Sequence, residues 1–183
     1  VKFFDVDWDV TRKEAIPKAV LIGNIQQYPD LTVVPTIFIT NRTMANLDLP
    51  AVNELAFKIK KKIQSLAGDY DFKEWQIDCD WTVSTRENYF FLLRTLKMQL
   101  PDCQLSATLR LHQAKFPKQT GVPPVDRVML MYYNMGDIDN WTSDNSIYNA
   151  QTAKQYVASI SNYKLPMDVV LPLFQWGIVY RDG

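Results

Sequence analysis

Two acidic side chains at the end of a predicted strand are the residues of this sequence best suited to chemistry. Asp78 and Asp80 lie two positions apart in the run Trp75–Trp81. Successive side chains of a strand point to opposite faces, so both carboxylates are expected on the same face. Two like charges at that spacing resist joint ionisation, which raises the pKa of one of them. The pair therefore predicts a functional site, with capping of the following helix as the structural alternative.

A second acidic phrase near the start of the chain closely resembles the first. Asp5, Asp7 and Asp9 alternate along the run Asp5–Asp9, and Asp7 precedes Trp8 as Asp80 precedes Trp81. By alternation these three acids share one face of a strand. A predicted strand over Thr32–Thr40 separates the two phrases. We therefore expect both acidic groups to meet at the carboxyl-terminal mouth of one sheet.

Strands and helices alternate along the chain. Runs rich in apolar and β-branched residues predict strands over Lys2–Val6, Thr32–Thr40, Glu74–Asp80, Gln104–Leu111, Arg127–Tyr133 and Met167–Phe174. Helical patterns between them predict helices over Arg12–Gln27, Leu49–Leu66, Ser84–Leu100 and Ala150–Ser161. Pro50 suits the first turn of the second helix and Gly68 its end, while Ser84 with Glu87 forms the pattern of a capping box.

This alternation predicts an α/β protein with a parallel sheet. The strands are interpreted as apolar on both faces, as buried parallel strands are. Six such units fit most of an eight-stranded (β/α)8 TIM-type barrel, or an open doubly wound sheet. The two acidic phrases favour the barrel, as an apparently incomplete one. We expect residues 1–183 to form a single barrel domain, excerpted from a longer barrel.

The bulk composition argues against several classes of function. Lys and Arg number 20, as do Asp and Glu, so the formal net charge is zero, and nothing electrostatic favours nucleic acid. No apolar run reaches the length of about 20 residues that spans a bilayer. The chain has one histidine, His112, and only six glycines, with no Gly-rich phosphate loop after any predicted strand. No cofactor and no metal are therefore expected.

The strand that carries Asp78 and Asp80 is similar to the DxxDxDxE strand of the family-18 glycoside hydrolases, the chitinase-like barrels. Met131–Asn134 resembles their sixth-strand Met-x-Tyr-Asp, and Val169–Arg181 resembles their seventh strand. The likeness covers most of residues 74–183 and extends also to uncharacterised bacterial hydrolase-like barrels. It implies a barrel that handles a glycan, an oligosaccharide or polysaccharide partner, and a location outside the cytoplasm, whether periplasmic, secreted or lipid-anchored. The oligomeric state stays open.

The chain departs from that family where the chemistry is decided. The proton-donating Glu of the family falls at Thr82, whose hydroxyl cannot act as a general acid near neutral pH. The first Asp of the motif falls at Trp75, and the sixth-strand Asp at Asn134. Another carboxylate, with Asp7 as the candidate, must then replace the acid, or the chain binds a glycan without hydrolysing it.

The expected site combines these acids with polar and aromatic residues at other strand ends. The predicted catalytic residues are Asp7, Asp78 and Asp80, and the predicted substrate-binding residues are Asp5, Trp81, Arg110, Tyr133, Asn134, Gln175 and Trp176. Tryptophans suit sugars because an aromatic face packs on the apolar face of a pyranose. Three functions remain open from the sequence: a glycosidase, a non-catalytic glycan-binding barrel, and an enzyme that uses the acids to hold a divalent metal.

Overall fold

The computed structural model describes residues 1–23, 30–68, 70–140 and 145–179. Its seven strands are β1 (Lys2–Asp9), β2 (Glu14–Lys18), β3 (Thr36–Ile39), β4 (Glu74–Cys79), β5 (Gln104–Arg110), β6 (Arg127–Met131) and β7 (Met167–Val170). Its helices are α1 (Asn41–Asn46), α2 (Leu49–Ala67), α3 (Arg86–Gln99), α4 (Leu111–Lys115), α5 (Pro117–Thr120), α6 (Ala150–Lys154) and α7 (Val157–Ser161). The α/β class and all six predicted strands are confirmed, with shorter bounds at most carboxyl ends.

One sheet runs through the whole molecule in the order β2-β1-β3-β4-β5-β6-β7. Every neighbouring pair is parallel except β1 and β2, which form an antiparallel hairpin. The sheet is open, because β2 and β7 are its two edges and do not pair with each other. The fold is therefore α/β with a mostly parallel open sheet, and a closed TIM barrel is not shown.

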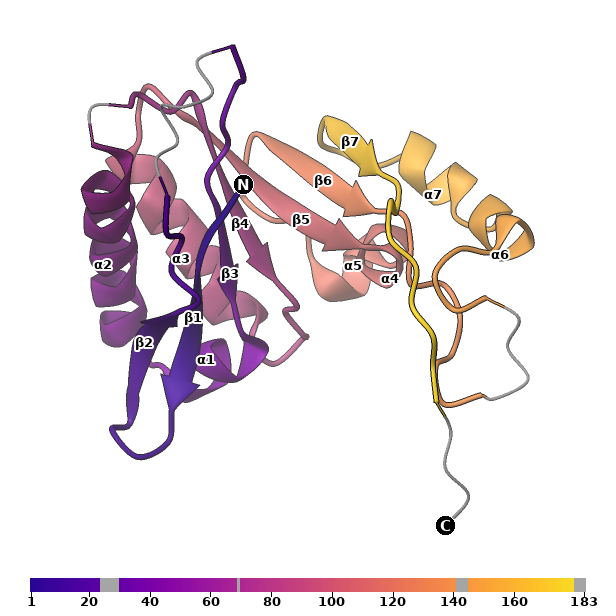
Figure 1. The fold of residues 1–183 in the computed structure, drawn as a ribbon, viewed down its shortest axis with the longest axis horizontal. Helices are drawn as coiled ribbons and strands as arrows, with labels where there is room; N and C mark the ends of the chain where they lie inside the picture. The colour runs from indigo at the N-terminus through magenta and orange to yellow at the C-terminus, as the bar shows by residue number, and fades with distance from the viewer. Residues whose placement is uncertain (24–29, 69, 141–144, 180–183) are drawn as a thin grey trace.

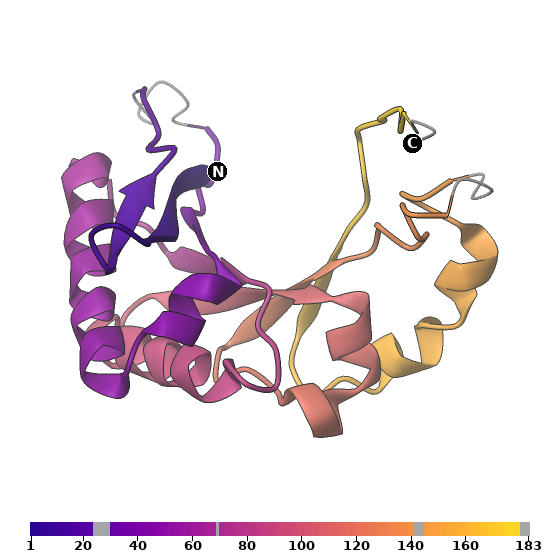
Figure 2. The ribbon, with the colours of Figure 1, turned by 90° about the horizontal axis from the view of Figure 1, so that it is seen from below.

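The sheet curves, and its helices lie along the outer, convex side (Figures 1 and 2). In the described residues no helix covers the inner, concave face in either view. The convex face packs the core: Phe4, Val6, Ile37, Ile39 and Ile77 are each at most 3% exposed. The burial of these side chains beneath α2 and α3 holds the sheet and the helix layer together.

The concave face is polar, which corrects the expectation of strands apolar on both sides. The strand register puts Asp5, Phe38 and Asp78 in one row across β1, β3 and β4. On the next strand, Ser106 and Thr108 alternate with core residues. These polar side chains are themselves largely buried, with Ser106 1% and Thr108 6% exposed, so the concave face is polar at β5 without being open to solvent there. Asp5 and Asp78 thus lie on the face of the sheet that the helices do not cover.

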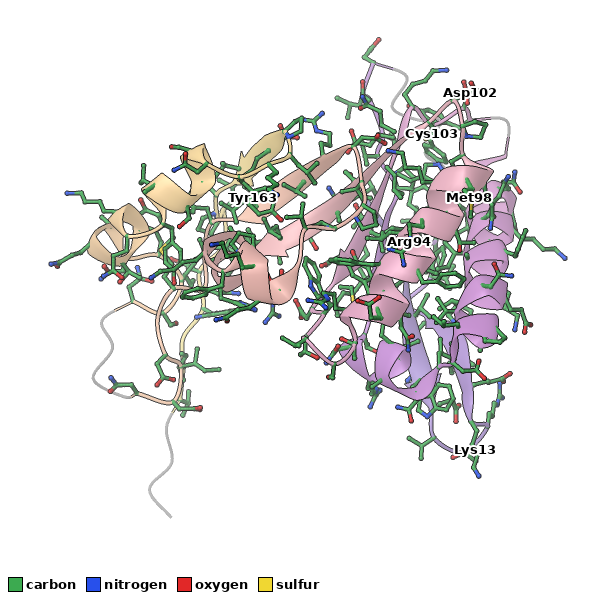
Figure 3. All side chains as sticks on the ribbon, turned by 180° about the vertical axis from the view of Figure 1, so that it is seen from behind. Lys13, Arg94, Met98, Asp102, Cys103 and Tyr163 are labelled. Atoms are coloured by element: carbon green, nitrogen blue, oxygen red, sulfur yellow. The ribbon has the colours of Figure 1, made fainter. Side chains whose placement is uncertain are left out.

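Residues 12–18, which were expected to begin a helix over Arg12–Gln27, form the tip and the second strand of the hairpin instead. Residues 24–27 of that range lie outside the described residues. The Asp9 carboxylate accepts hydrogen bonds from the backbone N–H groups of Thr11 and Arg12 at 2.9 and 3.0 Å. This local turn reverses the chain before a helix can start. Lys13, at the tip of the hairpin in Figure 3, takes a positive φ of 53° to complete the reversal.

The remaining helices match the sequence with changes at their ends. Helix α2 begins at Leu49 with Pro50 in its first turn and ends at Ala67, with Gly68 as the stop that was predicted. Helix α3 begins at Arg86 with Thr85 as its N-cap, so Ser84 cannot form the predicted capping box with Glu87. The Thr85 hydroxyl donates instead to Asn41 Oδ1 at 2.6 Å. The last predicted helix is divided into α6 and α7. None of the helices in the described ranges combines the length and apolar character that crossing a bilayer requires.

Candidate functional site

The carboxyl end of β4 places Asp78 and Asp80 on the concave face. Cys79, between them, is 2% exposed and points into the core beneath the helices. Positions two residues apart on a strand are separated by about 6.6 Å. The predicted alternation is therefore correct, and the two acids share one surface.

Asp78 is the more enclosed acid of the two. Its Oδ1 accepts a hydrogen bond from the Thr108 hydroxyl on β5 at 2.5 Å. Burial raises the pKa of Asp78 above its usual value, and the negative charge of Asp80 adds to the rise. The Thr108 hydrogen bond and the Arg110 guanidinium act in the opposite direction without cancelling it. Asp78 is thus disposed to hold a proton longer than an ordinary aspartic acid.

Asp80 differs because it has a cationic partner. The Arg110 guanidinium, at the end of β5, forms an ion pair and hydrogen bond with Asp80 Oδ2. Both side chains keep solvent contact, with 30% of Asp80 and 49% of Arg110 exposed. Arg110 was predicted from the sequence as a member of the site. It places a positive charge next to Asp80, beside the more enclosed Asp78.

Beyond Arg110, a cavity of about 290 Å³ lies at the carboxyl ends of β5 and β6. Its lining joins the predicted residues Arg110, Tyr133 and Asn134 to His112 and Tyr156. Burial raises the pKa of the Tyr133 phenol. Arg110 links the cavity to the acids, because it lines the cavity and pairs with Asp80. Asn134 has a positive φ of 55°, a conformation that asparagine tolerates better than most residues. The cavity therefore adjoins the acid pair.

An aromatic chain leads from this cavity to solvent. Phe174 contacts Tyr133 edge to face at a ring distance of 5.8 Å and Trp176 at 5.4 Å. Trp176 donates from its indole nitrogen to the Ser146 hydroxyl at 3.1 Å and is 48% exposed. Gln175, between the two rings, is exposed. Trp176 thus keeps part of its ring free, but β7 ends at Val170, so Gln175 and Trp176 do not close that strand as the sequence predicted.

Trp81 lies elsewhere, and its predicted role as a sugar platform is wrong for this structure. It is 1% exposed and stacks on Tyr89 at a ring distance of 5.1 Å. Its indole N–H donates to the Thr120 carbonyl at 2.9 Å. The reason is alternation along the chain past β4: the residue after Asp80 turns back toward the helices, so it joins the core.

Asp7 forms a separate cluster on β1. Its carboxylate is bound by Arg42 and by Lys18, whose Nζ lies 2.8 Å away, and it accepts from the Thr40 hydroxyl at 3.0 Å. These hydrogen bonds, that of Arg42 first, hold the pKa of Asp7 well below its usual range. A carboxylate so paired has no proton to donate near neutral pH, which argues against Asp7 as the replacement general acid. Within the described residues its contacts do not reach Asp78 or Asp80.

Asp5 lies in register with Asp78 but two strands away, which is about 10 Å at the usual strand spacing. Its carboxylate pairs with Lys2 at 2.8 Å. The structure therefore brings together Asp78, Asp80, Arg110, Tyr133 and Asn134. It leaves Asp5, Asp7 and Trp81 apart from them.

Sequence reasoning missed Thr108, which holds Asp78, and Tyr156, which closes the cavity. The signal for Thr108 was present, because Gln104, Ser106, Thr108 and Arg110 alternate along β5 as a polar face. Thr82, at the position of the missing acid, bonds to Ser84 at 2.9 Å in the turn that leads into α3. Among the described residues, no group of three or more acids, histidines or cysteines is placed to hold a metal ion.

Comparison with family models, curated proteins and solved structures gives no match for this chain. The likeness to the chitinase-like barrels therefore stays a prediction from residues 74–183. The class defined by the coordinates is an open, mostly parallel α/β sheet with an acidic pair at the carboxyl end of β4.

Proposed function

We propose that this chain is a carbohydrate-active protein that binds a glycan along the concave face and hydrolyses it between Asp78 and Asp80. One observation carries the proposal, namely the unequal surroundings of two adjacent acids. Asp78 is enclosed and has a raised pKa, whereas Asp80 is paired with Arg110. Pairs of acids whose surroundings differ in this way are typical of acid–base catalysis.

In the proposed reaction, Asp78 gives its proton to the leaving glycosidic oxygen. Asp80 takes a proton from a water molecule, whose oxygen forms the new bond to the anomeric carbon as the old bond breaks. This inverting reaction uses two carboxyl groups about 6.5–9.5 Å apart. The Cα atoms of same-face neighbours on a strand are about 6.6 Å apart, which allows their carboxyl groups that separation. The raised pKa of Asp78 supports the acid role that Thr82 cannot fill.

The cavity and the aromatic residues support a sugar as the ligand. A volume of about 290 Å³ lies near the lower limit for small-molecule sites, which suits one sugar ring. Tyr133 lines the cavity, while Phe174 and the half-exposed Trp176 extend an apolar wall toward solvent. Hydroxyl groups of a sugar can bond to Asn134 and His112, and its C–H faces can pack on the rings.

The test combines a turnover assay and a binding titration on chitotetraose and cellotetraose. We expect Asp78→Asn to lower the hydrolysis rate by about 10²–10⁴-fold while sugar binding persists. Asp71→Asn is the matched control, because Asp71 lies just before β4 at the opposite end of the strand and is 80% exposed. Wild-type activity in Asp78→Asn, or no binding of either sugar to the unchanged chain, would overturn the proposal.

A binding protein without catalysis is the second candidate. Thr82 in place of the family's acid favours it, as does the ion pair that engages Asp80 with Arg110. Saturable binding of a tetrasaccharide with no release of reducing ends would support this alternative. In that case Asp78→Asn and Asp80→Asn alter affinity alone.

A further inference from the structure

A groove on the convex side of the sheet lies away from the acids. It has a volume of about 360 Å³ and an almost entirely apolar floor. Strand β1 contributes Phe4 and Val6, β2 contributes Ala15 and Pro17, and α2 contributes Leu55 and Ile59. Phe4 and Val6 point to the opposite face from Asp5 and Asp7, so the groove and the candidate glycan site share no surface.

The groove lies where the layer of helices ends. Helices α2 and α3 pack side by side on the convex face, and α2 is the last helix before the hairpin edge (Figure 1). Sheets of this kind bury their apolar faces under a continuous layer of helices. From Leu55 to Ser65 the wall formed by α2 is about 15 Å long, at 1.5 Å per residue. That length matches three turns of another helix lying alongside.

The rim of the groove is positively charged. Lys58, Lys61 and Lys62 line it at the spacing that puts side chains on one flank of a helix. Lys58 pairs with Glu54 at 2.7 Å on the surface. In the described part of the chain, neither Lys61 nor Lys62 has a carboxylate within ion-pair distance, and the groove lining includes no acid. The electrostatic complement of this rim is an acidic partner.

We propose that the groove between α2 and the β1–β2 hairpin binds an amphipathic helix of another polypeptide. The apolar stripe of that helix packs on Ala15 and Pro17, above a floor of the buried Val6 and Ile59. Its acidic flank faces Lys58, Lys61 and Lys62. This is the helix-in-groove mode of recognition, in which apolar anchors give affinity and charges set partner and orientation.

The probe is a labelled 14-residue helical peptide with leucines at helical spacing and glutamates along one flank. Its binding to the full chain is followed by fluorescence anisotropy. We expect micromolar affinity, at least tenfold weaker binding of the analogue with lysines in place of glutamates, and no binding of a scrambled peptide. The triple variant Lys58→Glu, Lys61→Glu, Lys62→Glu should reverse the preference between the two charged peptides.

A matched triple variant, Lys118→Glu, Lys154→Glu, Lys164→Glu, makes the same charge change at exposed lysines outside the groove and should bind like the unchanged chain. Pro17→Glu places a charge in the groove and should abolish binding while circular dichroism shows the fold intact. Equal affinity for both charged peptides, no binding, or dodecanoate binding to the groove in place of the peptides would each overturn the proposal. These results do not depend on any activity of Asp78.

Discussion

Strands β1 and β4 carry nearly the same phrase, Asp-x-Asp-Trp, and build different structures from it. On β1 the second acid, Asp7, is held by two cations and a hydroxyl. On β4 the first acid, Asp78, meets a threonine, and Asp80 meets one arginine at the surface. The first cluster is a closed network of charges. The second includes an acid with a raised pKa, Asp78, and an arginine, Arg110, that also lines a cavity.

The difference comes from the neighbouring strands. Strand β1 lies between antiparallel β2, which supplies Lys18, and β3, after which Arg42 follows in α1. Strand β4 lies between β3 and β5, which present Phe38 and Thr108 beside Asp78. A repeated phrase therefore predicts which face an acid occupies, but its chemistry depends on residues distant in the sequence.

The largest difference is expected between the two tryptophans. Trp81→Ala removes a buried, stacked ring and should lower the free energy of unfolding by about 3–5 kcal/mol. Trp8→Ala affects a half-buried ring and should cost roughly half as much or less. Urea denaturation of both variants measures this. Equal losses would mean that the two phrases are packed alike, contrary to the structure.

A smaller difference is expected between the two paired acids. Asp7→Asn leaves Lys18 and Arg42 facing a neutral group in a site where the carboxylate is 10% exposed, and should cost about 1–3 kcal/mol. Asp80→Asn breaks a pair that water screens on both sides, and should cost at most about 1 kcal/mol. Chemical denaturation at neutral pH distinguishes them. If Asp80→Asn were the more destabilising, the assignment of the closed network to β1 would be wrong.

The pH dependence of stability should have opposite signs at the two acids. The folded-state pKa of Asp7 is below the ordinary 3.8, so its contribution is fully present above pH 3.8 and is lost as the pH falls below that value. The folded-state pKa of Asp78 is above 3.8, so the folded state loses stability as the pH rises from about 3.8 through that pKa. Denaturation curves of Asp7→Asn and Asp78→Asn at pH 3 and pH 7 check both signs. As the pH rises, the free energy of unfolding relative to wild type should fall for Asp7→Asn and increase for Asp78→Asn.

Variants of Thr108 test the cause assigned to the pKa of Asp78. Its hydroxyl lowers the pKa of Asp78, so Thr108→Val should raise that pKa further, and Thr108→Ser should leave it nearly unchanged. Carbon NMR of the Asp78 carboxyl group across the titration reports it directly. A fall in the pKa in Thr108→Val would contradict the assigned cause.

The sequence was sufficient for the elements that depend on local patterns. The strand at Glu74 and the helix from Leu49 to its glycine stop follow from periodicity and capping residues, and both were confirmed. The hairpin was missed because Ala15, Ile16 and Pro17 resemble a helix start, while the Asp9 turn that excludes it depends on one side chain. That hairpin puts an antiparallel strand beside β1, where a barrel would need another parallel strand.

For the site, alternation correctly placed Asp78 and Asp80, but it also predicted a common site with Asp7. The two acids have different partners, which lie far away in the sequence: Arg42 is 35 residues from Asp7, and Thr108 is 30 residues from Asp78. Trp81 was wrongly predicted to bind the substrate, because the sequence alone does not distinguish a tryptophan that packs on a sugar from one buried in the core. Only the packing of Tyr89 and Phe90 against its ring distinguishes the two.

The edge strand β2 has a consequence for how copies of this chain behave at high concentration. The Val6 carbonyl accepts from Thr40 N–H toward β3, so the partner of Val6 in β2, Pro17, turns its nitrogen toward the open edge. That nitrogen carries no hydrogen, and Glu14 and Lys18 add charge at either end of the strand. Fibre growth by edge-to-edge stacking is thereby opposed on this side. At the other edge of the described sheet, β7 lacks such protection, because Val169 is 47% exposed and no proline interrupts the strand.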